Sequence, residues 1–195
     1  MPLTPIQGWF FELRLPRPER FNMTLLLTVQ PRLETGVLLA AAQAVTEYHD
    51  AFRLRFSRLG ADAWRQEYAE SGAPLCFVEA DLSALPPTAR AAAITGAAER
   101  LDESLDLARG PVLRMASFRL GQGLPGRLLI VVHHLVMDAV SWGILVEDLA
   151  AACEQLRGGA AVRLPPRPVS FKRWSQRLSE HARSAALELE AEHWL

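Results

Sequence analysis

The stretch LLIVVHH, from Leu128 to His134, decides how this 195-residue chain is expected to fold. Its first five residues, Leu128–Val132, are all apolar. An unbroken apolar run of this length is typical of a strand that is buried on both faces, so we expect it near the centre of a sheet. A second strand is expected over residues 112–120, joined to the first through a turn that contains Gly121, Gly123 and Gly126.

Helices and further strands are expected on both sides of this pair. Apolar residues recur at helical spacing over residues 34–49, an Ala-rich segment follows Pro86 and Pro87 to about Asp106, and a third helix begins at Val140 and ends at Gly158 and Gly159. Strands are expected at residues 21–30, 52–57, 64–68 and 75–78. The proline-containing opening is interpreted as irregular, and two helical stretches are expected after a Pro-rich linker at 163–169.

Composition excludes several classes of function. Half of the residues are hydrophobic and the formal net charge is −1, so nothing indicates a nucleic-acid partner. Cys76 and Cys153 are far apart and form no metal-binding pattern, so neither a metal site nor a disulfide framework is expected. No leader peptide or membrane-spanning stretch is recognisable. We therefore expect a cytoplasmic protein without a membrane partner.

The candidate site lies where the apolar strand ends, at His133, His134 and Asp138. Side chains alternate along a strand, so the two imidazoles are expected to point in opposite directions, and a single cavity would receive one of them. Imidazole both accepts and donates a proton near neutral pH. Two structural interpretations remain open, a purely structural histidine and an aspartate that caps the next helix. Asp138 is also expected to form a buried ion pair with Arg53 or Arg55.

Six segments, in order along the chain, resemble the condensation superfamily of nonribosomal peptide synthetases. His133, His134, Asp138 and Ala139 match the family motif HHxxxDG with alanine in place of the glycine. The opening LTPIQGWFFE at residues 3–12 and the VSW at Val140, Ser141 and Trp142 are similar to epimerization domains. The other matches are HDAFR at 49–53, LDLARGPV at 105–112 and SFKRW at 170–174.

The resemblance implies a fold and a set of roles. The fold is an α/β lobe of the chloramphenicol-acetyltransferase type, a largely antiparallel mixed sheet with packed helices, and residues 1–195 correspond to the N-terminal lobe of two. His134 is the implied catalytic residue. The implied support for its loop comes from His133, Asp138, Arg53, Ala139, Ser141 and Trp142.

Two positions depart from the family pattern. If the motif glycine requires positive φ, Ala139 is strained. Gly143 stands where epimerization domains usually carry arginine.

The resemblance also implies a substrate and partners. The substrate is an aminoacyl or peptidyl thioester on the phosphopantetheine arm of a peptidyl carrier protein, and the lobe itself binds no cofactor or metal. Other partners are the C-terminal lobe, which supplies a glutamate, and neighbouring synthetase domains. The implied reaction is epimerization at the α-carbon, an isomerase activity. Three rivals stay open: peptide-bond-forming condensation, an inactive docking platform for a carrier or tailoring enzyme, and acyl transfer from coenzyme A.

Overall fold

A computed structural model describes residues 1–31, 33–60, 63–72, 75–166 and 169–194 of the chain. Its main sheet has four strands in the order β1-β6-β5-β4. Strand β6 pairs antiparallel with both of its neighbours, whereas β4 runs parallel to β5. The predicted mixed and largely antiparallel sheet is therefore confirmed. The strands are β1 (Asn22–Val29), β4 (Phe77–Asp81), β5 (Leu113–Arg119) and β6 (Gly126–His133).

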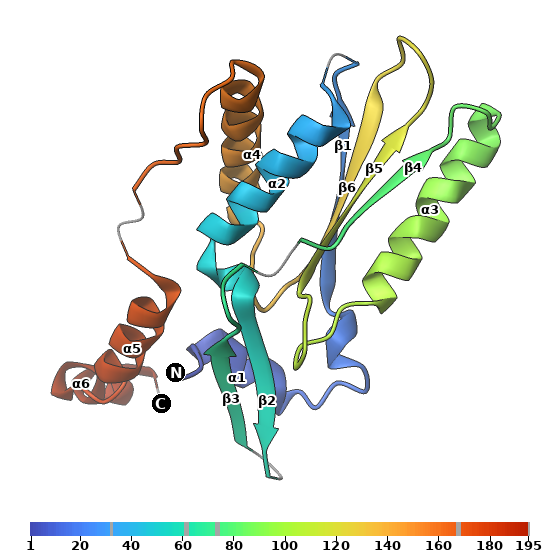
Figure 1. Ribbon diagram of the computed structural model, residues 1–195. Coiled ribbons are helices and arrows are strands. Elements are labelled where there is room, and N and C mark those ends of the chain that lie inside the picture. Colours follow the sequence, from blue (N-terminus) through green and yellow to red (C-terminus); the bar gives the residue numbers. More distant parts are fainter. Residues whose placement is uncertain (32, 61–62, 73–74, 167–168, 195) are drawn as a thin grey trace.

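Strand β6 is an interior strand that is buried on both faces, as its apolar run predicts. Leu128, Ile130 and Val132 belong to the larger core cluster, which lies under α2 (Thr35–Tyr48) and α4 (Ser141–Arg157). Leu129 and Val131 point to the opposite face and pack in a second cluster with α3 (Pro87–Glu103). Figure 1 shows the same layers, with α2 and α4 on one side of the sheet and α3 on the other.

The opening segment differs from the prediction, because it contains a helix, α1 (Pro5–Glu12), and a short 3-10 helix, η1 (Pro18–Arg20). Pro5 occupies the first helical turn, where its missing N–H costs nothing, and the side chain of Gln7 accepts a hydrogen bond from the backbone of Thr4. Prolines break a helix in its interior, but a proline directly after a capping residue favours a helix start.

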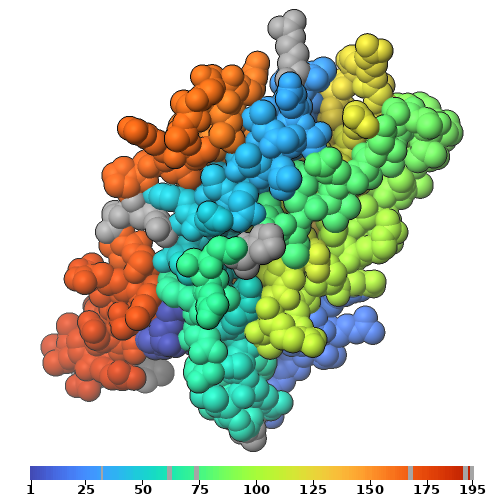
Figure 2. Space-filling view, viewed as in Figure 1, coloured from blue at the N-terminus to red at the C-terminus, as the bar shows by residue number. Residues whose placement is uncertain are grey.

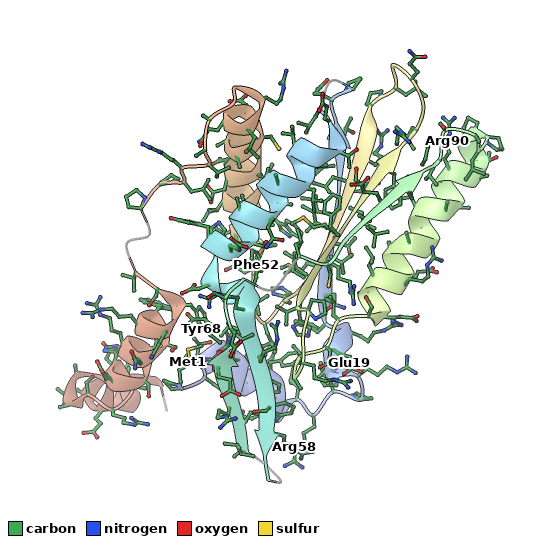
Figure 3. The ribbon with its side chains drawn as sticks, in the orientation of Figure 1. Met1, Glu19, Phe52, Arg58, Tyr68 and Arg90 are labelled. Carbon is green, nitrogen blue, oxygen red and sulfur yellow. The ribbon has the colours of Figure 1, made fainter. Side chains whose placement is uncertain are left out.

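A two-stranded hairpin, β2 (Leu54–Leu59) and β3 (Ala63–Tyr68), lies apart from the main sheet and follows the 3-10 helix η2 (Asp50–Arg53). The start of the chain lies against this hairpin, where the Met1 ammonium donates a hydrogen bond of 2.9 Å to the Gln66 carbonyl (Figure 3). The stacked rings of Phe11 and Trp64, with centroids 4.0 Å apart, fasten α1 to β3.

Two helices close the described chain, α5 (Phe171–His181) and α6 (Ala185–Trp194), as expected. The N-terminus of α5 reaches the hairpin, because the Lys172 amide donates to the Tyr68 hydroxyl at 3.0 Å. Figure 2 shows this pair of helices beside the hairpin at one end of the molecule. Arg167 and Pro168 of the predicted linker, and Leu195, lie outside the described residues. No helix among the described residues is long and apolar enough to cross a membrane.

Candidate active site

His134 is the first residue after β6 and begins the loop that leads to α4. Its backbone amide donates to the Phe21 carbonyl at 2.9 Å, and its ring stacks on the Phe21 ring with centroids 5.2 Å apart. Its Nδ1 lies 3.0 Å from the Met137 carbonyl oxygen. A carbonyl only accepts hydrogen bonds, so Nδ1 carries the proton and the neutral ring has its lone pair on Nε2. The exposed His134 side chain therefore offers a basic nitrogen at the surface.

His133 has the opposite environment, because it is fully buried. Its Nε2 lies 2.8 Å from the Pro18 carbonyl and must donate, while its Nδ1 accepts from the Leu135 amide at 3.1 Å. Both nitrogens of the neutral ring are therefore used. Burial is the main cause that lowers the pKa of His133, with a smaller contribution from neighbouring His134. This arrangement suits a structural histidine.

The lowered pKa of His133 predicts a pH-dependent stability. The unfolded chain binds a proton at His133 more readily than the folded chain does, so the free energy of unfolding decreases as pH falls below the unperturbed pKa of about 6.5. Urea unfolding at pH 7.5 and 5.5 measures the loss, and an NMR titration of the His133 ring measures its cause. A His133 midpoint at or above the unperturbed value would contradict the prediction.

Asp138 is exposed, so the predicted burial is wrong. Its Oδ1 accepts hydrogen bonds from the Ser141 amide at 2.9 Å and the Ser141 hydroxyl at 2.7 Å, and these bonds lower the pKa of the Asp138 carboxyl. The N-cap residue of α4 itself is Val140, so Asp138 lies two residues before the helix cap. Asp138 thus stabilises the turn that leads into α4 by accepting from Ser141, in the manner of a cap, but it is not the N-cap residue that the sequence left open as an alternative.

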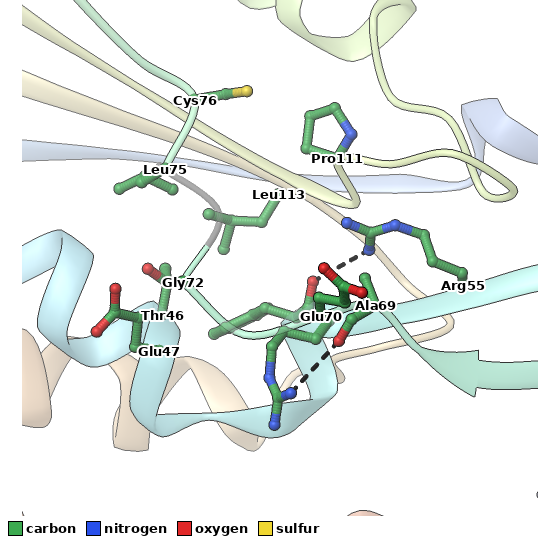
Figure 4. A pocket seen from close by; sticks show the side chains of 12 residues that line it. Thr46, Glu47, Arg55, Ala69, Glu70, Gly72, Leu75, Cys76, Pro111 and Leu113 are labelled. Carbon is green, nitrogen blue, oxygen red and sulfur yellow. Dashed lines mark hydrogen bonds between the residues drawn. The ribbon is translucent and has the colours of Figure 1, made fainter.

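The arginines proposed as partners of Asp138 lie elsewhere. The Arg53 guanidinium sits 5.1 Å from the centroid of the Tyr68 ring, and its Nη1 contacts the Ala69 carbonyl at 3.4 Å. Arg55 donates from Nε to the Arg109 carbonyl at 3.0 Å. Both arginines line a pocket between the hairpin, α2 and the start of β5 (Figure 4). The predicted ion pair is therefore wrong for both arginines, since Arg53 ends η2 and Arg55 lies on β2, and the contacts of both are with residues other than Asp138.

This correction changes the expected cost of removing Asp138. Loss of one partner of a buried ion pair would cost about 3–5 kcal/mol, whereas loss of an exposed cap costs about 1 kcal/mol. We expect Asp138→Ala to lower the free energy of unfolding by the smaller amount, measured by urea denaturation. Asp138→Asn keeps an acceptor oxygen and should retain most of the stability. A loss above about 3 kcal/mol for Asp138→Ala would contradict the exposed hydrogen bonds described above and would indicate a buried ion pair.

The remaining motif positions surround the start of α4. Among the described non-glycine residues only Arg14 has a positive φ, 49°, so the strain expected at Ala139 is absent. Ser141 binds Asp138, and the half-buried Trp142 packs against the main core. A Cβ atom at Gly143 would meet nothing within 4 Å, so the space next to the backbone is open at this position.

The surface around His134 is open. Its ring neighbour Phe21 is partly exposed, and Val140 and Ile144, at the start of α4 after the loop, expose large parts of their side chains to solvent. His134 lines none of the main pockets formed by the described residues. Within the described ranges, no group of three or more His, Cys, Asp or Glu side chains could hold a metal ion. The arrangement presents one oriented imidazole on an uncovered, partly apolar face.

Sequence reasoning missed one residue of this site, Gln7. It is almost completely buried in α1, and its Nε2 donates to the Leu135 carbonyl at 3.2 Å, inside the His134 loop. The spacing Thr4-x-x-Gln7 directly before an apolar helical run is a capping-box pattern that would have located the helix. Its contact with a residue 128 positions away has no local signal.

The family model for the condensation domain matches residues 1–195. The chain belongs to the condensation domain family. It is 44% identical to part of a linear gramicidin synthase from Brevibacillus parabrevis over 196 residues, which covers the whole chain and 2% of that protein. This condensation-family chain also superimposes on the epimerization domain from the third module of tyrocidine synthetase B with a TM-score of 0.89 and 31% identity.

The structural relatives confirm the predicted fold class. The starter condensation domain of rhizomide synthetase matches with a TM-score of 0.80 at 20% identity, covering 97% of this chain and 45% of that one. The match to the tyrocidine epimerization domain covers 98% of this chain and 43% of that one. The condensation-family chain therefore spans less than half of each of these solved domains.

Proposed function

We propose that this chain is the N-terminal lobe of an epimerization domain that inverts the α-carbon of an aminoacyl or peptidyl thioester on a carrier protein. The observation that carries the proposal is His134, whose Nδ1 is held by the Met137 carbonyl while the side chain as a whole is exposed. The likeness to the tyrocidine epimerization domain, at 31% identity, supports this subtype. So do the opening at residues 3–12 and the VSW after the motif.

In the proposed reaction His134 exchanges the α-proton. Its Nε2 lone pair takes the proton, the C–H electron pair moves into the thioester as an enolate, and a proton returns to the opposite face of the carbon. Imidazole suits both directions of transfer near neutral pH. Inversion needs a second acid/base group on the other face, and we assign it to a glutamate of the C-terminal lobe.

The neighbours of His134 hold its loop in this proposal. His133 donates to the Pro18 carbonyl and accepts from the Leu135 amide. Asp138 accepts from the Ser141 amide at the start of α4. The ring of Phe21 backs the imidazole, so the base nitrogen keeps one direction. Such pre-orientation is worth a large part of a catalytic rate.

The proposed partners follow from the substrate. A peptidyl carrier protein presents the thioester on its phosphopantetheine arm, which is part of the substrate and not a resident cofactor. The C-terminal lobe covers the exposed His134 and the start of α4, where Val140 and Ile144 are exposed. Neighbouring synthetase domains supply and remove the carrier-bound substrate.

Condensation is the second candidate, because the family match itself bears the name of that reaction. In that case His134 would assist an acceptor amine in its attack on a donor thioester. Both reactions use an oriented base beside a thioester, so product chemistry separates them.

The test uses the complete polypeptide, in which residues 1–195 are joined to the second lobe. It is incubated with carrier protein loaded with an L-aminoacyl thioester, and the released amino acid is separated on a chiral column. A mixture of D and L isomers supports epimerization. A longer peptide in the presence of a second loaded carrier supports condensation, and retained carrier binding without either product supports a docking platform.

A further inference from the structure

Gln7 joins the first helix to the loop that carries His134. It is 1% exposed, and both ends of its amide are used. Oε1 accepts from the Thr4 amide at 2.9 Å, and Nε2 donates to the Leu135 carbonyl at 3.2 Å. A glutamine is suited to this position because it offers an acceptor and a donor on one rigid group.

Both backbone polar groups of Leu135, which lie in two successive peptide units, are hydrogen-bonded in this loop. Its carbonyl accepts from Gln7, and its amide donates to Nδ1 of His133. The preceding residue is His134, whose own Nδ1 binds the carbonyl of Met137. Leu135 thus lies on the short stretch of backbone between His134 and Met137, whose carbonyl fixes the His134 tautomer, so a shift of the Leu135 backbone is expected to disturb that bond.

Helix α1 supports the imidazole by a second route. Phe10, one turn after Gln7, contacts both the His133 ring and the Phe21 ring, with centroid distances of 5.7 Å and 5.3 Å. Phe21 in turn stacks on His134. The face of α1 that carries Gln7 and Phe10 is thus buried against the site, while Ile6 and Trp9 are exposed.

We propose that Gln7 is a positioning residue, which holds the Leu135 carbonyl so that His134 keeps its proton on Nδ1 and presents Nε2 to the substrate. The assignment to catalysis rests on the proposed function of His134. The assignment to the tautomer does not, because it follows from the hydrogen bonds alone.

The first experiment measures the tautomer directly by ¹⁵N NMR of the histidine rings in the 195-residue chain, with the His134 signals assigned from their loss in His134→Ala. Gln7→Met removes donor and acceptor at similar volume. We expect wild type to show mainly the Nδ1–H form and Gln7→Met to show a mixture. An unchanged tautomer ratio in folded Gln7→Met would overturn the proposal.

Two control variants separate positioning from stability. Gln66 is a second fully buried glutamine, whose Nε2 donates to the Pro2 carbonyl, so Gln66→Met perturbs a comparable bond away from the loop. Thr4→Pro removes the amide bonded to Gln7 Oε1, together with the Thr4 side chain at the N-cap of α1, and leaves the Leu135 bond, at a φ of −73° that proline accepts. Both should leave the His134 tautomer unchanged. A shift in either variant as large as in Gln7→Met contradicts a specific role for the Leu135 bond.

A measurement on the wild-type chain covers the case in which Gln7→Met does not fold. The Gln7 side-chain amide protons should exchange with D₂O more slowly than those of the exposed Gln122. Equal exchange rates would show that the bond to Leu135 is not maintained, and the proposal would fail.

The last arm measures catalysis in the complete polypeptide. Because a displacement of about 1 Å can cost about 100-fold, we expect Gln7→Met to lower kcat by about 10- to 100-fold with little change in KM. Gln66→Met should stay within about twofold of wild type by the same reasoning. If the wild-type polypeptide is inactive, the proposed function is contradicted. The NMR measurement of the His134 tautomer then decides alone whether Gln7 positions the imidazole. An active wild type with unchanged kcat in Gln7→Met contradicts Gln7 alone.

Discussion

In the complete polypeptide, His134→Ala should lower the rate of α-deuteration of a carrier-bound L-aminoacyl thioester by about 10²- to 10⁴-fold, the usual contribution of a general base. The reason is that the substitution removes the proposed base, the imidazole of an exposed residue, without removing a buried residue. Mass spectrometry of the amino acid released after incubation in D₂O gives the rate.

His181→Ala is the matched control for this prediction. His181 is an exposed histidine on α5, so its removal changes the histidine content without touching the loop after β6. It should leave deuteration unchanged. If His134→Ala exchanges the α-proton as fast as the control does, His134 is not the base.

Leu129→Ala is expected to produce the largest loss of stability among these variants, about 3–5 kcal/mol. Leu129 lies on interior strand β6, is 1% exposed, and packs with Val131 and Phe118 in the cluster under α3. Truncation leaves a cavity that a central strand paired on both sides cannot collapse to fill. The free energy of unfolding from urea denaturation measures the effect.

The sheet provides a control at the same register. Leu26 on edge strand β1 pairs with Leu129, yet it is 46% exposed. Leu26→Ala removes the same atoms from a partly solvated site, so its cost should stay below about 1 kcal/mol. Equal losses for the two variants would mean that β6 is not the buried centre of the sheet.

The sequence predicted the parts of the fold that repeat a local pattern. The apolar run of β6 and the helical spacing of α2 and α4 have the periods of a strand buried on both faces and of helices packed on one face. Their ends shifted by a few residues because hydrogen bonding, and not apolarity, determines where an element ends.

The contacts of the site were less predictable. The tautomers of His133 and His134 depend on which carbonyls lie beside them, and Pro18 reaches His133 from 115 positions away. For Asp138 the expected long-range contact was wrong, although a local partner was close in the sequence. We expected it to pair with Arg53 or Arg55, whereas its hydrogen bonds are with Ser141, only three residues further along the chain.

In the proposed reaction this chain provides one of the two acid/base groups of an epimerization site. The most direct test incubates the 195-residue chain and the complete polypeptide separately in deuterated buffer with a carrier-bound L-aminoacyl thioester, and follows α-deuteration and stereochemistry together. The complete polypeptide should form the deuterated D isomer, whereas the chain alone should form none, because inversion needs a second group on the opposite face of the carbon. Efficient formation of the D isomer by these 195 residues, abolished by His134→Ala, would contradict this division of the site.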